Sequence, residues 1–446
     1  MSDRKQLRLA GFLFSGNASQ SWRVPAFTAH DSLNIDYFID YARLAESAGI
    51  ETLFLADGAS FPGTRDPEVA GYWSVSTFEP VTLMAAIAAR TDHIGLIYTA
   101  SVTDNEPTHL ARQLVSLDHI SHGRAGWNVV TTPGPGSANL GITDPEEGPA
   151  KYERARAFLE VTTALFDSFE DDALVRDKAR GVYVDLAKVH APAIDNGFYT
   201  ATQPLRVERS PQGWPVLAQA GTSPEGITFG AEHADVIYCA NYSIAAGQRT
   251  CRAIKDRAVA AGRRPEDVVI LTGAAVIWGE TQEEAERKLR EVSSLWPIEV
   301  ALQNMAIDFP GHDLDDPFPE NYVPRFSKGR SAAIADFALT NGLTIRQAAE
   351  RVSVGLGHRP LVGTTRSIAD DFEAWLDAGA TDGFALIQPR LIDGLRDFVT
   401  HVVPELKRRG LIRGDYAGRT LRENLGLRRP ENSHLVAARR HLPAAE

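Results

Sequence analysis

The chain has little sulfur: two of its 446 residues are cysteine and three are methionine. Two cysteines, Cys239 and Cys251, cannot build a disulfide framework or a zinc site with four cysteine ligands. Hydrophobic runs of membrane-spanning length are also missing, and residues 1–9 lack the long apolar core of a signal peptide. We therefore expect a cytoplasmic protein in which Cys239 is a small buried hydrophobe.

An excess of positive charge is missing as well. The 58 acidic side chains outnumber the 46 basic ones, which gives a formal net charge of −12. Nucleic acids and acidic membrane surfaces require a basic face, so neither is an expected partner. The hydrophobic share of 43% is sufficient for a large core.

Short apolar runs alternate with longer amphipathic stretches along the chain. The predicted strands are residues 7–14, 52–56, 94–101, 125–130, 214–220, 235–240, 268–277 and 383–388. The predicted helices between them include residues 35–48, 80–90, 108–120, 152–169, 245–261 and 282–292. This alternation predicts an α/β fold, and a closed (β/α)8 TIM barrel is its simplest form.

Three segments depart from the alternation. Residues 170–213 and 293–360 are too long for plain connections, and we expect insertions that shape or cover the barrel mouth. The tail from about residue 411 to 446 is expected to wrap the body or a partner subunit. We interpret residues 1–446 as a single barrel domain with these additions.

The segment from Gly221 to Pro224 has the composition of an anion-binding turn. Gly221 permits close approach of the backbone, Ser223 is a good N-cap for the helix predicted to follow, and Pro224 suits the first helical turn. Free N–H groups and the positive end of a helix dipole would then face one anion, such as a ligand phosphate. An ordinary capped turn between a strand and a helix is the alternative.

Polar residues also lie at the ends of other predicted strands. Asp57 follows the second strand, Thr103 follows the third, and Asn128 lies in the fourth. The carboxyl ends of barrel strands meet at one mouth, where barrel enzymes bind their ligands, so these residues are expected to converge with Ser223. A helix cap at Asp57 and an Asn128 satisfied by the backbone are the alternatives.

Longer motifs are more specific. They are ETLFLADG at 51–58, SLDHISHGRAGWNVV at 116–130, LVGT at 361–364 and TLRENLGL at 420–427. In this order the motifs resemble the bacterial luciferase-like superfamily, and the second is similar to the nitrilotriacetate/EDTA/dibenzothiophene-sulfone monooxygenase family. The resemblance extends from about residue 7 to about residue 430.

The resemblance implies an enzyme that uses reduced FMN supplied by a separate NAD(P)H-dependent flavin reductase. It implies that O2 forms a peroxide or hydroperoxide at flavin C4a, with an N5 adduct left open, and oxidises a small organic substrate by C–N or C–S cleavage. By motif position, the implied flavin contacts are Asp57, Thr103, Tyr152 and Ser223, with Asn128 beside the ring. A non-prolyl cis peptide near residues 100–102 and a homodimer or homotetramer are also expected.

The chain departs from the family pattern where protons would be handled. Many relatives carry a histidine shortly before the tyrosine that matches Tyr152, but this chain has Gly148. Relatives often carry a histidine in the loop after the first strand, where this chain has Asn17. Asn17 and His358 are the candidate catalytic residues, since imidazole changes charge near neutral pH; a solvated loop position is the alternative for His358.

Two other enzyme classes remain open at this point. A deazaflavin-dependent dehydrogenase of the same superfamily would share the barrel and the phosphate turn but would transfer hydride without O2. A metal-dependent barrel hydrolase requires several His or carboxylate ligands at strand ends, where only Asp57 is well placed, so no metal is expected. The motifs do not identify the substrate.

Overall fold

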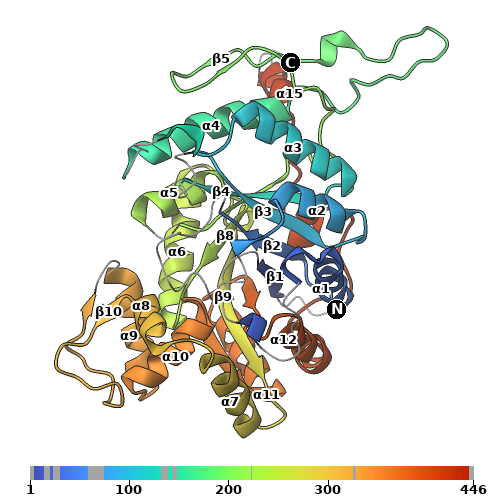
Figure 1. Cartoon of the computed structure of the whole chain (residues 1–446). Coiled ribbons are helices and arrows are strands. Elements are labelled where there is room, and N and C mark those ends of the chain that lie inside the picture. The colour runs from blue at the N-terminus through green and yellow to red at the C-terminus, as the bar shows by residue number, and fades with distance from the viewer. Residues whose placement is uncertain are drawn as a thin grey trace.

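A closed barrel of parallel strands forms the centre of the molecule (Figure 1). The computed structural model describes residues 5–14, 21–23, 31–58, 75–131, 139–142, 148–221, 223–324 and 328–440. The barrel strands are β1 (Arg8–Phe14), β2 (Thr52–Ala56), β3 (Gly95–Ser101), β4 (Ala125–Val130), β7 (Val216–Gln219), β8 (Val236–Cys239), β9 (Val269–Trp278) and β13 (Gly383–Ile387). Each pairs in parallel with its neighbours, and β13 pairs with β1, which closes the ring. The predicted (β/α)8 TIM barrel is confirmed.

The sheet also has a ninth strand, β12 (Arg359–Gly363), which the sequence pattern does not predict. β12 pairs only with β9, with Arg359 opposite Ala274, whereas β8 ends opposite Thr272. β12 therefore continues along the edge of β9 where β8 ends. Its second residue is Pro360, which cannot donate a ladder hydrogen bond and is typical of an edge strand.

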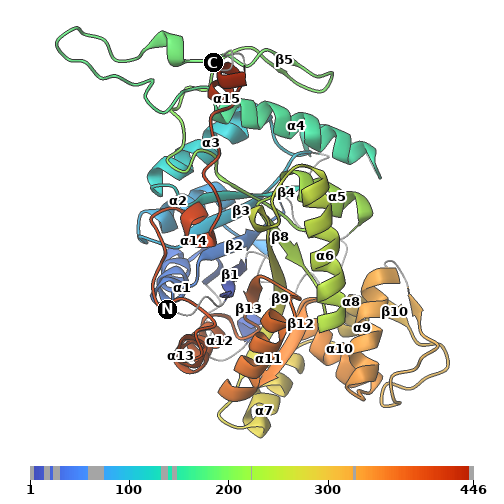
Figure 2. The same cartoon turned by 180° about the vertical axis from the view of Figure 1, so that it is seen from behind.

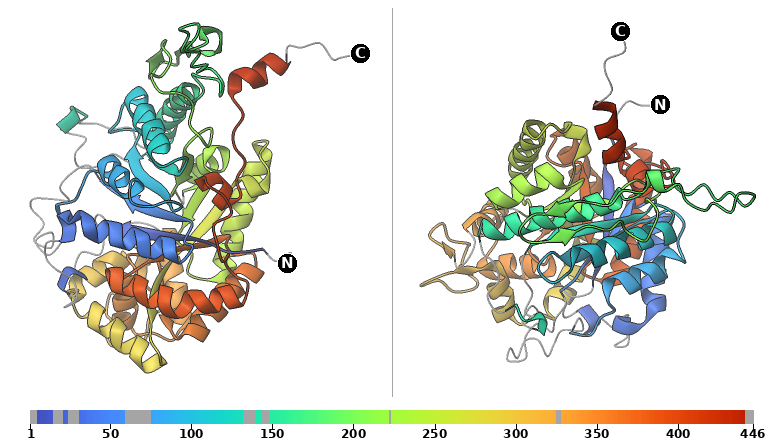
Figure 3. Two further views of the ribbon diagram at one scale, coloured as in Figure 1. Left: turned by 90° about the vertical axis from the view of Figure 1, so that its right-hand side faces the viewer. Right: turned by 90° about the horizontal axis from the view of Figure 1, so that it is seen from above.

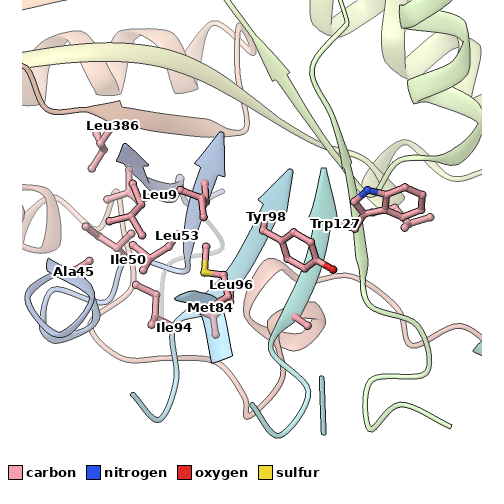
Figure 4. Close-up of a cluster of buried hydrophobic side chains, with 14 of the residues drawn as sticks. Leu9, Ala45, Ile50, Leu53, Met84, Ile94, Leu96, Tyr98, Trp127 and Leu386 are labelled. Atoms are coloured by element: carbon pink, nitrogen blue, oxygen red, sulfur yellow. The ribbon is translucent and has the colours of Figure 1, made fainter. Parts of the chain in front are cut away.

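Helices cover the outside of the barrel. They are α1 (Ile35–Ser47), α2 (Pro80–Ala88), α3 (Pro107–Ile120), α4 (Ala150–Phe166), α5 (Pro224–His233), α6 (Ile244–Ala260), α7 (Gln282–Ser293), α11 (Thr365–Asp377), α12 (Leu391–Asp397) and α13 (Val403–Arg408). Figure 4 shows part of the apolar layer beneath them, where Leu53 and Leu96 of the strands lie with Ala45 of α1 and Met84 of α2. Burial of a leucine side chain contributes about 2 kcal/mol, so this layer is a main source of stability.

Side chains that point into the barrel form a second apolar cluster. Within it, the rings of Phe54 and Tyr238 lie with their centroids 4.1 Å apart. The amino-terminal end of the barrel is closed by α14 (Leu421–Leu425), whose Leu421 belongs to the same cluster. A Cβ at Gly95 would lie 2.3 Å from Leu421 Cδ1, so only glycine leaves room for this leucine.

The first insertion, residues 170–213, lies at the amino-terminal end of the barrel, so its predicted place at the mouth is wrong. It connects the end of α4 to the start of β7, and connections from a helix to the next strand lie at the end where the strands begin. It carries a hairpin of β5 (Ile194–Asp195) and β6 (Thr200–Ala201) and projects away from the barrel (Figures 1 and 2). The sequence shows that this insertion is long, but it does not show at which end of the barrel the insertion lies.

The C-terminal tail wraps the body of this chain, which is one of the two arrangements expected for it. The Tyr416 hydroxyl donates to the carbonyl oxygen of Ile50 at 2.7 Å. Further along, α15 (Ser433–Arg440) lies against the first insertion, where His434 stacks on His190 with ring centroids 4.0 Å apart (Figure 2). The tail and the first insertion thus support each other.

The second insertion forms a helical lobe beside the barrel (Figure 3). It consists of α8 (Ile298–Met305), β10 (Ile307–Asp308), β11 (Val323–Pro324), α9 (Lys328–Thr340) and α10 (Ile345–Val354). Met305, Phe318 and Ile334 form its own apolar cluster, which also includes Tyr242. Tyr242 follows the carboxyl end of β8, so this insertion lies beside the barrel mouth, as expected.

The predicted cis peptide is wrong, because no peptide bond among the described residues is cis. The chain stays paired with β4 just past the end of β3: the Val102 N–H donates to the Val130 carbonyl at 2.9 Å, one residue beyond the strand. Regular pairing with β4 therefore extends through residues 100–102.

Two expectations about the rest of the chain are met. Both cysteines are buried and free, and burial raises the pKa of the Cys251 thiol to about 12. Cys239 packs among apolar side chains, so its prediction as a small buried hydrophobe is confirmed. Among the described helices, none has the length and apolar character that a membrane crossing requires.

Candidate active site

The carboxyl ends of four neighbouring strands, β2, β3, β4 and β7, lie in one row at the mouth of the barrel, and polar residues lie at the first three. Asp57 directly follows β2, Thr99 of β3 lies opposite Asn128 of β4, and Asn128 lies opposite Ala218 of β7. Neighbouring strands are about 4.8 Å apart, so the row spans about 14 Å from β2 to β7. This row can hold an elongated ligand across the barrel mouth.

A cavity of about 470 Å³ lies at the β2 and β3 end of the row. Its polar lining residues are Asp57, Thr77, Glu79, Thr99, Ser101, Asp104, Asn105 and Gln113. The Glu79 carboxylate also caps α2, where it accepts from the Val81 and Thr82 N–H groups at 3.0 and 2.8 Å. The size and the mixed lining are typical of a small-molecule site.

Thr99 and Asn128 are joined by a hydrogen bond between neighbouring strands. Asn128 Nδ2 donates to Thr99 Oγ1 at 2.9 Å, and Thr99 Oγ1 donates to the Leu55 carbonyl at 2.9 Å. Asn128 is 3% exposed, and its Oδ1 is buried with no hydrogen-bond partner among the described residues. Buried polar atoms rarely remain unpaired, so this oxygen marks a place for a ligand donor.

The turn before α5 has the geometry predicted for an anion site. Ser223 is the N-cap, and its Oγ accepts from the Gly226 N–H at 3.0 Å. The Tyr152 hydroxyl, at the first turn of α4, lies 3.4 Å from Ser223 Oγ. Two hydroxyls therefore gather at the positive end of the α5 dipole.

Two glycines allow close packing in this turn. A Cβ on Gly226 would lie 2.9 Å from the Tyr152 hydroxyl and 3.2 Å from Ser223 Oγ. A Cβ on Gly221 would lie 2.1 Å from Gln219 Nε2. These two positions therefore have no room for a side chain. The start of α5 with the Ser223 and Tyr152 hydroxyls fits the phosphate end of a mononucleotide.

The remaining predicted site residues are less central. Thr103 is half-buried, and its N–H donates to Ser101 Oγ at 3.1 Å beside the cavity. The His358 ring is half-buried against β9, where a Cβ on Gly273 would lie 2.1 Å from its Nδ1, and its centroid is 6.3 Å from that of Phe12. Asn17 lies outside the described residues. Tyr152 thus lies with Ser223 at the start of α5, Asn128 lies with Thr99 on neighbouring strands, and Asp57 lies with Thr99 at the cavity.

Within the part of the chain that the structure describes, no group of three or more His, Cys, Asp or Glu side chains is arranged to hold a metal ion. The fully buried carboxylate of Asp118 lies at the opposite end of the barrel. It accepts from the Ala125 N–H at 2.8 Å and from Gln212 Nε2 at 2.7 Å, while burial raises its pKa. Asp118 therefore has a structural role in the fold.

Three residues of the site have roles that the sequence argument does not give. Thr99 orients Asn128, Gly226 lets the Tyr152 hydroxyl pack against the turn, and Glu79 fixes the start of α2 at the cavity. The capping role of Glu79 has a sequence signal, because it directly precedes Pro80 at the start of a predicted helix. The roles of Thr99 and Gly226 depend on contacts with other strands and helices.

A closed parallel barrel with a ligand cavity and an anion turn on its carboxyl face is the architecture of an enzyme that binds a phosphorylated ligand. The chain belongs to the luciferase-like monooxygenase family, whose model matches residues 16–382. The resemblance seen in the motifs is thereby confirmed, and the protein is a monooxygenase of the reduced-flavin-dependent class.

Individual relatives match over nearly the whole length. Nitrilotriacetate monooxygenase component A of Aminobacter aminovorans is 40% identical, with 97% of this chain and 99% of the relative covered. N-acetyl-S-(2-succino)cysteine monooxygenase of Bacillus subtilis (strain 168) is 38% identical, with the same coverage. The solved structure of a riboflavin lyase with modified FMN and riboflavin superposes with a TM-score of 0.82 at 32% identity, covering 96% of this chain and 97% of that one. These relatives do not favour the dehydrogenase or the metal-dependent hydrolase.

Proposed function

We propose that this protein is the oxygenase component of a two-component system in the cytoplasm. It takes reduced FMN from a separate NAD(P)H-dependent flavin reductase and uses O2 to oxidise a small organic substrate, with cleavage of a C–N or C–S bond. One oxygen atom enters the substrate and the other leaves as water, with two electrons from the reduced flavin. The observation that carries this proposal is the Ser223 turn at the start of α5, which lies at the same carboxyl face of the barrel as Asn128 of β4 and Asp57 after β2.

In this proposal the chain holds FMN by its two ends. Ser223, Gly221 and Tyr152 bind the phosphate at the start of α5, where free N–H groups favour an anion. Asp57 and Thr103 bind at the other end, with Asn128 beside the ring. Bound reduced FMN supplies the electrons and the reactivity toward O2.

In this proposal the barrel excludes water from beneath the ligand and fixes the orientation of the ligand. Phe12, Phe54 and Tyr238 fill the barrel below the row of polar residues, which excludes water from beneath the ligand. His358 lies beside Phe12 and is the described side chain proposed to move protons, together with Asn17. The relatives named for nitrilotriacetate and for an S-substituted cysteine support substrates that contain nitrogen or sulfur.

The experiment supplies reduced FMN from any flavin reductase and screens amine, sulfone, thioether and chelator substrates. Oxygen uptake, product and free peroxide are measured together. The proposal expects product equal to oxygen consumed with at least one substrate, and a purified protein that is nearly colourless. Tightly bound yellow flavin that survives dialysis, or oxygen uptake that yields peroxide only with every substrate, contradicts it.

We also propose that the protein assembles as a homodimer or homotetramer through the first insertion. Large apolar side chains are exposed along this insertion at Val175, Val182, Tyr183, Leu186 and Phe198. Such a concentration on one projecting segment is typical of an interaction surface. Replacement of Tyr183 and Leu186 by Glu is expected to give a smaller particle in light scattering. Val259→Glu, a 53% exposed site on α6, is the control and leaves the particle unchanged.

A further inference from the structure

The orientation of the Asn128 amide follows from a count of protons. Thr99 has one hydroxyl proton, and that proton is donated to the Leu55 carbonyl at 2.9 Å. Thr99 Oγ1 can therefore only accept from Asn128, so the amide nitrogen faces Thr99 at 2.9 Å. The amide carbonyl must face the other way, and this oxygen is the buried atom without a partner among the described residues.

The side of the barrel wall on which this oxygen lies is also determined. Trp127 and Val129, the neighbours of Asn128 on β4, belong to the apolar layer outside the barrel. Side chains alternate along a strand, so Asn128 points inward, on the same face as its register partner Thr99, which lines the cavity. A buried acceptor with no donor among the described residues thus lies on the inner face of the barrel wall, beside Thr99.

The oxidised and reduced states of flavin differ in the hydrogen bond that they can make with this acceptor. Oxidised isoalloxazine has a bare N5 that accepts hydrogen bonds, whereas reduced isoalloxazine carries an N–H at N5 that donates. A fixed carbonyl oxygen can pair with the donor of the reduced state and repels the lone pair of the oxidised state. An amide turned the other way would have the opposite preference.

We propose that Thr99 is a positioning residue that makes this site selective for reduced flavin, by holding the Asn128 carbonyl toward an N–H that the ring carries only when reduced. The inference rests on the proposed use of FMN. It explains how the protein captures flavin from a reductase and releases it after oxidation without a change of fold. Thr99 acts through Asn128 and need not touch the flavin.

The test compares dissociation constants for reduced and oxidised FMN, measured by titration without O2. Thr99→Val keeps the shape but removes the hydroxyl, and the ratio of oxidised to reduced dissociation constants is expected to fall about tenfold, the effect of one hydrogen bond. The same change lowers the reduction potential of bound FMN by about 30 mV. Thr99→Ser keeps the hydroxyl and is expected to retain the wild-type ratio.

Two further variants test whether a change in this ratio comes only from a general disturbance of the structure. Asn128→Leu removes the carbonyl itself and is expected to lose the same selectivity, which decides the question if Thr99→Val does not fold. Thr162→Val is the matched control, because Thr162 is fully buried in α4 and its hydroxyl donates to the Phe158 carbonyl at 2.8 Å. Its redox ratio is expected to equal that of the wild type.

The outcomes separate this inference from the proposed function. If wild type binds FMN but Thr99→Val weakens both redox states equally, or neither, the inference is overturned while the FMN proposal stands. If wild type binds FMN in neither state, the proposed function fails and this inference fails with it. A fall in the ratio for Thr99→Val that Thr99→Ser does not share supports both.

Discussion

Asp167 and Arg209 form an ion pair in which both side chains are almost fully buried. Arg209 Nε lies 3.0 Å from Asp167 Oδ1, with the two side chains 1% and 0% exposed. The other oxygen of Asp167 accepts from the Ser433 N–H at 2.9 Å, and Arg209 Nη2 donates to the Pro430 carbonyl at 2.8 Å. One pair thus joins the end of α4, the first insertion and the C-terminal tail.

Arg209→Met is expected to destabilise the protein by about 3 kcal/mol or more, because it leaves the Asp167 charge buried without its cation. Added Asp167→Asn should recover part of this loss by removing that charge. Chemical denaturation measures both, and proteolysis within residues 170–213 should become faster in the single variant. Arg180→Met breaks an exposed pair with Asp177 and is the control, with stability nearly unchanged. Equal effects of Arg209→Met and Arg180→Met would contradict the prediction.

Ser223→Asp is expected to weaken FMN binding at least a hundredfold, because its carboxylate would face the phosphate. Aspartate is as good an N-cap as serine and favours the helix dipole, so the thermal stability of the free protein should not fall. Ser223→Ala loses one hydrogen bond and should weaken binding only about tenfold. Flavin titration and thermal melting are the measurements. Unchanged FMN affinity in the aspartate variant would show that the phosphate binds elsewhere.

Gly226→Ala is expected to reduce FMN affinity without stabilising the protein. Alanine normally gains about 1 kcal/mol over glycine within a helix, but here its Cβ would lie 2.9 Å from the Tyr152 hydroxyl. Tyr152→Phe removes that hydroxyl, so the double variant should recover the helix gain in thermal melting while flavin affinity stays low. A single variant that melts higher and binds FMN normally would mean that the turn has more room than the structure indicates.

Stability should depend on pH through Glu51. Burial raises its pKa from 4.5 to about 7, although Arg8 lies 3.8 Å away and the Leu9 N–H donates to it at 2.7 Å. The folded state therefore binds this proton more tightly than the unfolded state, so the contribution is complete below about pH 4.5 and is lost as pH rises through 7. The difference between these two pKa values corresponds to roughly 3 kcal/mol in the free energy of unfolding. Glu51→Gln should flatten the free energy of unfolding between pH 5 and 8, and an identical slope in both proteins would count against this.

Much of the barrel is predictable from the sequence because its signals are local. The predicted bounds of β2 and β4 equal the observed ones, since each strand is an apolar run between polar residues. The place of the first insertion is not local. It depends on Arg209 reaching Pro430, across more than two hundred residues, and no periodic pattern encodes that contact.

The candidate site divides in the same way. The capping role of Ser223 can be read from Ser223 and Pro224, which are neighbours in the chain. The special position of Asn128 cannot, because it requires the register that sets Thr99 opposite it and the absence of a donor for its oxygen among the described residues. Residue types alone predict which residues are candidates for the site. The pairing between strands determines which hydrogen bonds those residues can make.

The leucine of α14 that fills the space above Gly95 has a consequence for biosynthesis. Leu421 is among the last residues of the core to leave the ribosome, whereas the strand that receives it is made in the first quarter of translation. The ring can close once β13 has been made, and its amino-terminal end stays unsealed until Leu421 follows. A chain that stops before residue 421 would therefore pair β13 with β1 but leave this end of the barrel uncovered.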